Sequence, residues 1–189
     1  MSIDEWALTR SLAALTAYMA APAVTLSDQL GVLVSAAAEL LGVDSVGILL
    51  LDDFDHVRTV AVSGPAAAAL EQAQEQLQLG PGIDVFAARR VVAVVDLATD
   101  PDYERLWSEL VDTGVRGVLS APVIVRNEIV GNLNAITGQR HEWSPAERRA
   151  GAALGGLIGQ LLRTATSSAP DVDALRDIAS ERETGEPGT

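Results

Sequence analysis

The chain of 189 residues is long enough for one domain with terminal extensions, and its formal net charge of −13 argues against binding to nucleic acid or to an anionic membrane surface. The absence of cysteine excludes thiol catalysis, disulfides, iron–sulfur clusters and thioether attachment of a cofactor. All thirteen basic residues are arginine, which also excludes lysine nucleophiles and Schiff bases.

The first predicted element is an amphipathic helix over residues 3–20. Its apolar stripe has helical spacing and consists of Leu8, Leu12, Leu15 and Met19. Acidic residues precede this segment, which is unlike a signal peptide, and no apolar run reaches the length of a membrane span. We therefore expect a cytoplasmic protein with no membrane partner.

A second helix is predicted from residue 26 to residue 41, where Gly42 ends it. Two strands follow at 45–51 and 57–64, and the acidic turn between them indicates an antiparallel hairpin. Residues 65–79 are rich in alanine, glutamine and glutamate, a composition that favours a helix.

The segment "LQLGPGIDVFAARRVVAVVDL", residues 77–97, changes character twice. The Gly-Pro-Gly break at 80–82 is followed by a helical pattern over 83–90, and then by an apolar strand over 91–95. We interpret it as a connection that lies close over the sheet, with the short helix as its roof.

Residues 98–114 predict a loop and a short helix, and strands follow at 117–125 and 128–137. Pro122 indicates an edge or a bulge in the first of these strands. The pattern of the other strand predicts two apolar faces, with Ile129, Leu133 and Ala135 on one face and Val130 and Ile136 on the other. Ser144, Pro145 and Glu147 form a capping-box pattern that opens a last helix, which runs to about residue 163.

This order of elements predicts an α+β fold with a central antiparallel sheet. The terminal helices cover one face, and the loops and helices of residues 64–115 cover the other. We expect an N-terminal helix in residues 1–23, the folded domain in residues 24–165, and a mostly disordered acidic tail in residues 166–189.

Three segments in this order resemble the GAF domain family. They are "LGPGIDVFAARRVVAVVDLATDPDYERL", "GVRGVLSAPVIVRNEIVGNLNAIT" and "HEWSPAERRAGAALGGLIGQLL". The resemblance covers residues 24–163 and implies a GAF-like sheet. The nearest type is the actinobacterial GAF domain often fused to an RNA-binding ANTAR module, and no such module is visible in the short acidic tail.

The residues exclude several activities that the resemblance implies. Free methionine sulfoxide reduction and covalent bilin attachment need cysteine, and the cyclic-nucleotide signature needs lysine. Haem needs an axial ligand, but His56 and His141 fall at positions that we expect to be exposed. The acidic clusters at 52–55 and 100–102 fit turn chemistry as well as a cation site. We expect no cofactor, no metal and no catalytic residue, and hence not an enzyme.

The predicted function is that of a non-catalytic sensory or regulatory domain. It binds a small molecule or a protein partner and signals through its terminal helices. Six residues form the candidate ligand pocket: Asp84, Phe86, Tyr103, Trp107, Ser120 and Asn134. The alternative is a ligand-free dimerisation or scaffold module with a collapsed pocket, in which the aromatic residues only fill the core.

A homodimer through the terminal helices is also predicted, because the last helix carries a glycine stripe beside an apolar one. The residues assigned to this dimer helix are Leu12, Gly151, Leu154, Gly155, Ile158 and Gly159. The glycines have a second interpretation, close packing within one chain, which the sequence leaves open.

Overall fold

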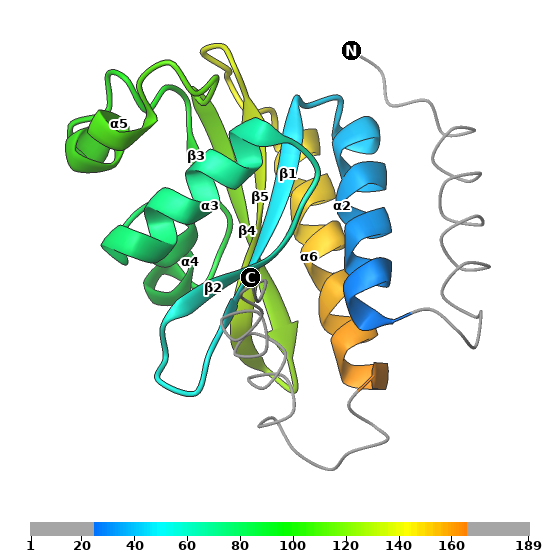
Figure 1. The fold of residues 1–189 in the computed structure, drawn as a ribbon. Coiled ribbons are helices and arrows are strands. Elements are labelled where there is room, and N and C mark those ends of the chain that lie inside the picture. Colours follow the sequence, from blue (N-terminus) through cyan, green and yellow to red (C-terminus); the bar gives the residue numbers. More distant parts are fainter. Residues whose placement is uncertain (1–24, 166–189) are drawn as a thin grey trace, which may run out of the picture.

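The computed structural model describes residues 25–165 and shows one antiparallel sheet between two layers of helices (Figure 1). The five strands lie in the order β2-β1-β5-β4-β3, and every neighbouring pair is antiparallel. The expected α+β class is therefore confirmed. The strands are β1 (Ser45–Leu51), β2 (Val57–Val62), β3 (Val92–Val94), β4 (Gly117–Val125) and β5 (Glu128–Thr137).

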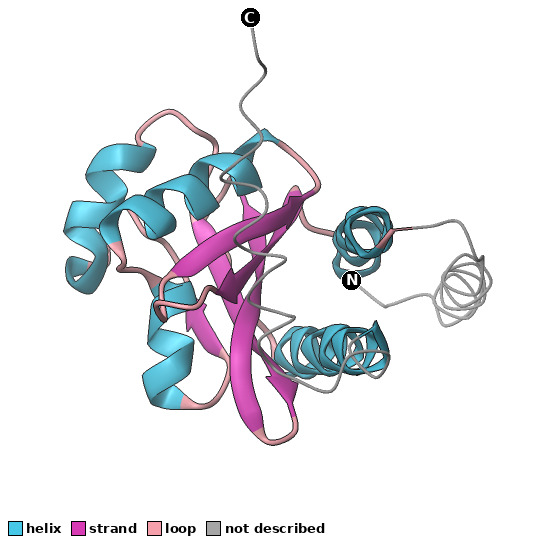
Figure 2. Cartoon of the chain, turned by 60° about the horizontal axis from the view of Figure 1, so that its bottom comes forward, coloured by secondary structure: helices cyan, strands magenta, loops and turns pink. Residues whose placement is uncertain are grey.

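The helices divide between the two faces of the sheet, as Figure 2 shows. One face is covered by α2 (Leu26–Leu41) and α6 (Pro145–Ala165). The other carries α3 (Pro65–Leu77), α4 (Pro81–Ala88), the 3₁₀ turn η1 (Pro101–Tyr103) and α5 (Glu104–Leu110). The expected helix over 3–20 and the expected tail over 166–189 lie outside the described residues. Within residues 25–165, no helix is both long and apolar enough to cross a membrane.

Both terminal helices of the described domain begin with a capping box. At α6 the Ser144 hydroxyl accepts from the Glu147 N–H at 3.2 Å, and Glu147 accepts from the Ser144 N–H at 2.7 Å. Thr25 and Asp28 make the same reciprocal pair at α2, which ends at Gly42 with a φ of 64°. These caps satisfy N–H groups that have no partner within the helix, so the boundaries follow from local chemistry.

The short helix after the Gly-Pro-Gly break begins earlier than the expected residue 83. It runs from Pro81 to Ala88, with Gly80 as its N-cap. Pro81 occupies the first turn, where its missing N–H costs no hydrogen bond and its fixed φ suits a helix. The proline therefore belongs to the helix that the sequence pattern placed after it.

Pro122 lies both at a locally unpaired edge of β4 and next to a bulge, the two settings that the sequence indicated as alternatives. Strand β3 pairs with β4 only as far as Ser120, so β4 has a single neighbour, β5, at Pro122. The register between β4 and β5 then shifts between Val123 and Ile124. Pro122 therefore removes no ladder hydrogen bond on the side that faces away from β5.

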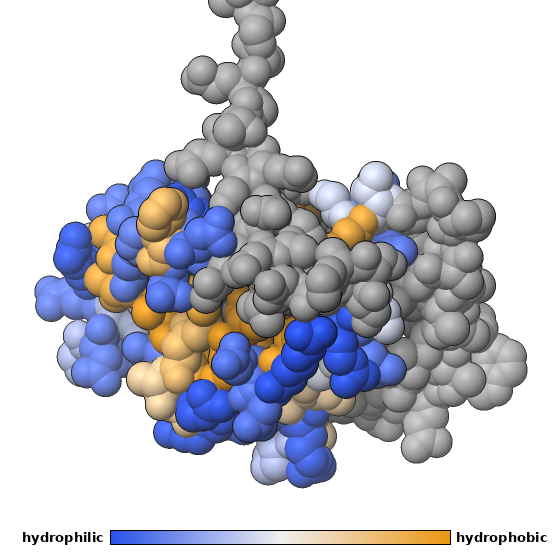
Figure 3. All heavy atoms as spheres, turned by 90° about the horizontal axis from the view of Figure 1, so that it is seen from below, coloured by the Kyte–Doolittle hydropathy of each residue, from blue (hydrophilic) through white to orange (hydrophobic). Residues whose placement is uncertain are grey.

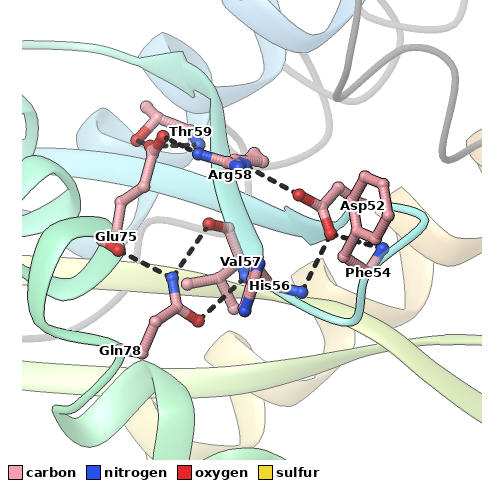
Figure 4. A network of polar contacts seen from close by, with 8 residues as sticks. All are labelled: Asp52, Phe54, His56, Val57, Arg58, Thr59, Glu75 and Gln78. Carbon is pink, nitrogen blue, oxygen red and sulfur yellow. Dashed lines mark hydrogen bonds and ion pairs between the residues drawn. The ribbon is translucent and has the colours of Figure 1, made fainter.

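The turn between β1 and β2 is organised by Asp52 (Figure 4). Its Oδ1 accepts from the N–H groups of Phe54 at 2.8 Å and His56 at 2.9 Å, and its Oδ2 accepts from Arg58 Nε at 2.9 Å. Burial would raise the pKa of Asp52, but these hydrogen bonds and the guanidinium hold it below its usual value. The acidic turn is thus accounted for by turn chemistry.

Side chains from α3 and from its C-cap residue cover the free edge of β2 in the same view (Figure 4). Glu75 Oε2 accepts from the Thr59 N–H at 3.0 Å, and Gln78 Oε1 accepts from the Val57 N–H at 3.3 Å. An exposed edge strand offers unpaired N–H groups to other chains. These two contacts occupy that edge and fix α3 across the sheet.

Two apolar clusters fill the space on either side of the sheet. The larger joins α2 and α6 to the inward-facing residues of the central strands, and includes Trp143. The smaller joins α3 and α5 to Val118 and Ile136. On the outside, Figure 3 shows apolar surface framed by hydrophilic side chains on the face seen from below. Among the described residues, the exposed large apolar side chains are Phe54, Val62, Val111, Ile124 and Leu157.

The glycine stripe of α6 faces the chain's own sheet, which corrects the dimer argument. A Cβ at Gly155 would overlap the Pro122 carbonyl oxygen, and one at Gly159 would overlap that of Ile124. A Cβ at Gly151 would lie 2.6 Å from Leu119 Cδ2. The other assigned residues of α6, Leu154 and Ile158, are buried in the same cluster.

None of these five positions on α6 is left free to contact a second copy. Their spacing by four lets the helix lie close against β4, which is the packing interpretation that the sequence left open. Leu12 lies outside the described residues, and a homodimer formed by other surfaces stays a prediction.

Adjacent glycines of α6 give a matched test of this packing. Gly155→Ala should lower the free energy of unfolding by about 1–3 kcal/mol, because the methyl group meets backbone that cannot rotate away. Gly156→Ala should raise it by about 0.5–1 kcal/mol, since nothing lies within 4 Å of its Cβ and alanine favours the helix. Urea denaturation of both variants measures the difference, and equal effects would contradict the close contact with β4.

Candidate functional site

Five polar side chains lie fully buried between α3 and the sheet, where an apolar core is expected. Glu71 and Gln74 come from α3, Ser120 from β4, and Asn132 and Asn134 from β5. Each has 0% exposed surface. They form one hydrogen-bonded group, which we call the buried polar cluster.

Helical and strand periodicity together bring these residues to one place. On α3, residues 67, 70, 71 and 74 share a face, so Glu71 and Gln74 point inward with Ala67 and Leu70. On β5, residues 132, 134 and 136 alternate onto the face that α3 covers. This corrects the expectation that both faces of the strand are apolar: between Val130 and Ile136, that face carries two asparagines.

The hydrogen bonds of the cluster converge on the Glu71 carboxyl group. Asn134 Nδ2 donates to Glu71 Oε1 at 2.9 Å and to Oε2 at 2.8 Å, and Gln74 Nε2 donates to Oε2 at 2.9 Å. Ser120 Oγ in turn donates to Asn134 Oδ1 at 2.5 Å. The amide orientation of Asn134 is thus fixed from both ends.

The Gly-Pro-Gly segment is attached to the same cluster through the backbone of Gly82. Its N–H donates to Gln74 Oε1 at 2.7 Å, and its carbonyl accepts from Asn132 Nδ2 at 2.9 Å. A Cβ at Gly82 would lie 2.9 Å from both Asn132 Oδ1 and Gln74 Oε1. Gly80 has a φ of 137°, which side chains rarely allow. These contacts explain why the helical pattern is interrupted at residues 80–82 and why the next segment lies directly over the sheet.

One polar atom of the cluster is left over. Among residues 25–165, Asn132 Oδ1 has no hydrogen-bond partner, although the side chain is fully buried. A buried acceptor without a donor costs about 1–3 kcal/mol, and such atoms are rare in folded proteins. The free acceptor lies next to Gly82, at the point where the Gly-Pro-Gly segment covers the cluster.

The Glu71 carboxyl group titrates far from its usual range. Burial raises its pKa to about 8, against the hydrogen bonds from Asn134 and Gln74, and the charge of nearby Glu75 acts in the same direction as burial. On the sheet side, Gly47 of β1 leaves the space for this carboxyl, because a Cβ there would overlap Glu71 Oε1. At neutral pH the group is therefore mostly a neutral acid.

The structure places the six predicted pocket residues in separate groups. Ser120 and Asn134 belong to the buried polar cluster. Tyr103, which is 7% exposed, donates its hydroxyl hydrogen to Asp84 Oδ2 at 2.5 Å and so connects η1 to α4. Burial, followed by this hydrogen bond, raises the pKa of Tyr103 well above its usual value.

The two remaining aromatic residues lie on different helices, Phe86 on α4 and Trp107 on α5, and both are half-buried. The Arg116 guanidinium lies over the Trp107 ring, 5.7 Å from its centroid, and also pairs with Asp96. Tyr103 and Trp107 both belong to the apolar cluster around α5. All of these contacts are made with other residues of the protein. An aromatic cage around a ligand therefore stays a prediction.

Sequence reasoning missed Glu71, Gln74 and Asn132. The signal was present for the first two, because both fall on the apolar stripe of a helix-biased segment. An acid and an amide at stripe positions indicate buried polar groups that need partners. Asn132 and Asn134 carry the complementary signal on the strand. Their meeting could not be predicted, because it depends on where α3 crosses the sheet.

The other titratable candidates have structural partners. Asp100 caps η1 by accepting from the Asp102 N–H at 3.1 Å. His141 Nε2 lies 2.7 Å from Glu147 Oε1, and its ring contacts Trp143 edge-on, while His56 is exposed in the β1–β2 turn. Within the described part of the chain, no group of three histidine or acidic side chains could hold a metal ion.

Comparisons with known proteins identify the family of this fold. A family model described as GAF domain matches residues 23–163. The chain belongs to the GAF domain family. The resemblance to the type that is fused to ANTAR modules is a finer statement, which stays a prediction. No curated protein matches the chain.

Several solved structures have the same fold. The GAF domain of a phosphoenolpyruvate-protein phosphotransferase from Coxiella burnetii is 21% identical, with a TM-score of 0.66 over 86% of this chain and 96% of that one. A corresponding domain from Acinetobacter is 19% identical, with a TM-score of 0.64 over 88% and 98%. Free methionine-R-sulfoxide reductase from Neisseria meningitidis, solved with its substrate, is 18% identical, with a TM-score of 0.65 over 89% and 96%. At these identities the likeness shows the fold alone.

The raised pKa of Glu71 predicts a pH dependence of stability. In the unfolded chain this acid ionises near its usual pKa of 4.5, whereas in the folded protein it keeps its proton up to about pH 8. The folded state therefore binds more protons in this window, and its stability falls as the pH rises. Between about pH 5 and 8 this group should remove on the order of 3 kcal/mol of unfolding free energy.

Glu71→Gln isolates this contribution, because glutamine does not titrate. The unfolding free energy of the variant, relative to wild type, should rise over that pH window in urea titrations. Glu109→Gln is the matched control, since Glu109 is an exposed acid on α5, the helix that packs beside α3. The same pH profile for wild type and both variants would contradict a neutral buried Glu71.

Proposed function

We propose that this chain is a non-catalytic regulatory GAF domain that binds a small polar molecule at the buried polar cluster. Its terminal helices α2 and α6 would carry the signal onward. GAF domains generally bind small molecules in signalling proteins, and this chain matches that family over most of its length. The observation that carries the proposal is Asn132 Oδ1, a fully buried acceptor beside the Gly-Pro-Gly segment that has no hydrogen-bond partner among residues 25–165.

The composition of the cluster supports binding over a purely structural role. A buried carboxyl group that must stay protonated, held by amides, is a costly way to fill a core. Apolar side chains of similar volume usually give equal or higher stability. Perturbed acids and unsatisfied polar atoms gather instead at sites where a ligand exchanges hydrogen bonds with the protein.

The route from this site to the terminal helices passes through β4. Ser120 faces the cluster, while its neighbours Leu119 and Ala121 face α6 at Gly151. Further along β4, Gly155 and Gly159 lie directly against backbone carbonyls. Because these contacts have no side chain to absorb a movement, a shift of β4 is passed on to α6.

The second candidate function is a ligand-free dimerisation or scaffold module. It is favoured by the closure of the cluster, in which the protein's own groups already hold all three hydrogen bonds to Glu71. In this alternative the cluster only fixes the position of α3 and α4. The two functions differ in whether the Gly-Pro-Gly segment opens to admit a molecule.

Native mass spectrometry of the protein purified from its own host separates them. We expect a bound small molecule in addition to the polypeptide mass, and loss of that molecule in Asn132→Leu, which has the same branched shape without polar atoms. Ser27→Ala, at an exposed position of α2, is the control and should retain it. A polypeptide mass alone, combined with a dimer, would support the scaffold instead.

Hydrogen exchange should then connect the site to α6. Removal of the bound molecule is expected to speed amide exchange in residues 79–90 and in α6, while the β1–β2 turn changes less. Unchanged exchange in α6 would contradict transmission through β4.

A further inference from the structure

The hydrogen-bonding inventory of the buried polar cluster specifies what kind of molecule fits there, if the proposed function holds. Among residues 25–165, the one atom of the cluster with no partner is an acceptor, Asn132 Oδ1, and an ionised Glu71 carboxylate would accept further hydrogen bonds. Asn134 and Gln74 each direct an amide group at Glu71, and Asn132 directs one N–H at the Gly82 carbonyl. A ligand for this site therefore needs to donate.

Within residues 25–165, no cationic side chain acts on the Glu71 carboxyl group. Among the described residues, the charged group that acts on Glu71 is Glu75, one turn along α3, and it disfavours ionisation. The elements packed against α3 present uncharged groups here, namely Gly47 of β1, Asn134 of β5 and Gly82 of α4. On β2, Arg58 is directed to Asp52 and Glu75 instead.

We propose that the site takes a small cation rich in N–H groups, of the protonated amine or guanidinium class, and that Glu71 is ionised in the complex. Such a ligand supplies both missing elements, the counter-charge for the buried carboxylate and a donor for Asn132 Oδ1. The net charge of −13 also attracts a cation and repels an anion.

The access of this cation would be over the Gly-Pro-Gly segment. Gly82 is hydrogen-bonded to both Gln74 and Asn132, and a Cβ at Gly80 would lie within 3.0 Å of Gln74 and Leu106. Pro81 is the only side chain larger than hydrogen in this segment, so an outward movement of residues 80–82 would expose the free acceptor by withdrawing one proline ring. Gly82 holds this position by the two hydrogen bonds that its backbone makes with the cluster.

Methylguanidinium and methylurea are a matched pair of probes, because they have nearly the same shape and differ in charge. Each is titrated into ¹⁵N-labelled protein, and the side-chain amide signals of Gln74, Asn132 and Asn134 report binding. We expect methylguanidinium to shift these signals saturably, with an affinity at least tenfold higher than that of methylurea. Methyl phosphate, an anion, should not shift them.

The pH dependence gives a second readout, since binding requires Glu71 to lose its proton. The apparent affinity for methylguanidinium should rise about tenfold per pH unit below pH 7.5 and level off above about pH 9. Glu71→Gln should weaken binding at least tenfold and remove this pH dependence. Glu109→Gln, which removes an exposed acid from α5 and the same formal charge, should leave both unchanged.

The outcomes separate the two proposals. If methylurea or methyl phosphate shifts the three amide signals as strongly as methylguanidinium, the cation class is wrong and the binding site stands. An affinity for methylguanidinium that does not change with pH, or falls equally in both glutamine variants, also overturns the cation. If none of the three probes shifts the amide signals of wild type, the site is closed to small molecules, and the proposed function fails with it.

Discussion

The burial of one carboxyl group, that of Glu71, is the constraint around which this domain is arranged. An acid inside a protein must either lose its charge or find partners, and here it does both. The space for it exists because β1 has a glycine, Gly47, at that point. Asn134 and Gln74 are oriented by their bonds to the carboxyl, and Gln74 in turn holds the backbone of Gly82.

The two faces of β4 make different kinds of contact, one polar and one closely packed. A single strand can make both because its successive side chains point to opposite faces. One face presents Ser120 to the buried polar cluster, and the other lets α6 approach through its glycines. Both contacts are close and allow little relative movement. One is a network of hydrogen bonds, and in the other the glycines of α6 pack against the backbone of β4. This coupling of a polar site to a tightly packed terminal helix is the physical basis of the regulatory role that we propose.

Much of the fold could be predicted from the sequence, because its elements follow local rules. The capping box at Ser144, the strand pair around residues 126–127 and the α+β order all depend on nearby residues. The early start of α4 at Pro81 is a local effect as well. What sequence patterns could not decide is which surface a stripe faces, and the glycines of α6 show this, because a small-residue stripe suits a second helix and a sheet equally well.

Only part of the candidate site could be predicted from the sequence, again because packing between distant segments decides which side chains are buried. Ser120 and Asn134 stood out as polar residues in apolar strands, whereas Glu71 and Gln74 fall on the apolar stripe of a helix that is rich in polar residues, where their burial is harder to recognise. Their burial depends on the crossing of α3 over β1 and β5, which is fixed in part by Glu75 and Gln78 at the edge of β2. Contacts between distant segments therefore determine the chemistry of Glu71.

The central claim, a buried Glu71 that is neutral at physiological pH, is tested most directly by following its carboxyl carbon in a ¹³C NMR titration of the folded protein. The Glu71→Gln variant assigns the signal by its disappearance. The account predicts a titration midpoint near pH 8, well separated from the exposed glutamates. A midpoint near 4.5, together with the surface acids, would contradict it and remove the reason to regard the cluster as a site.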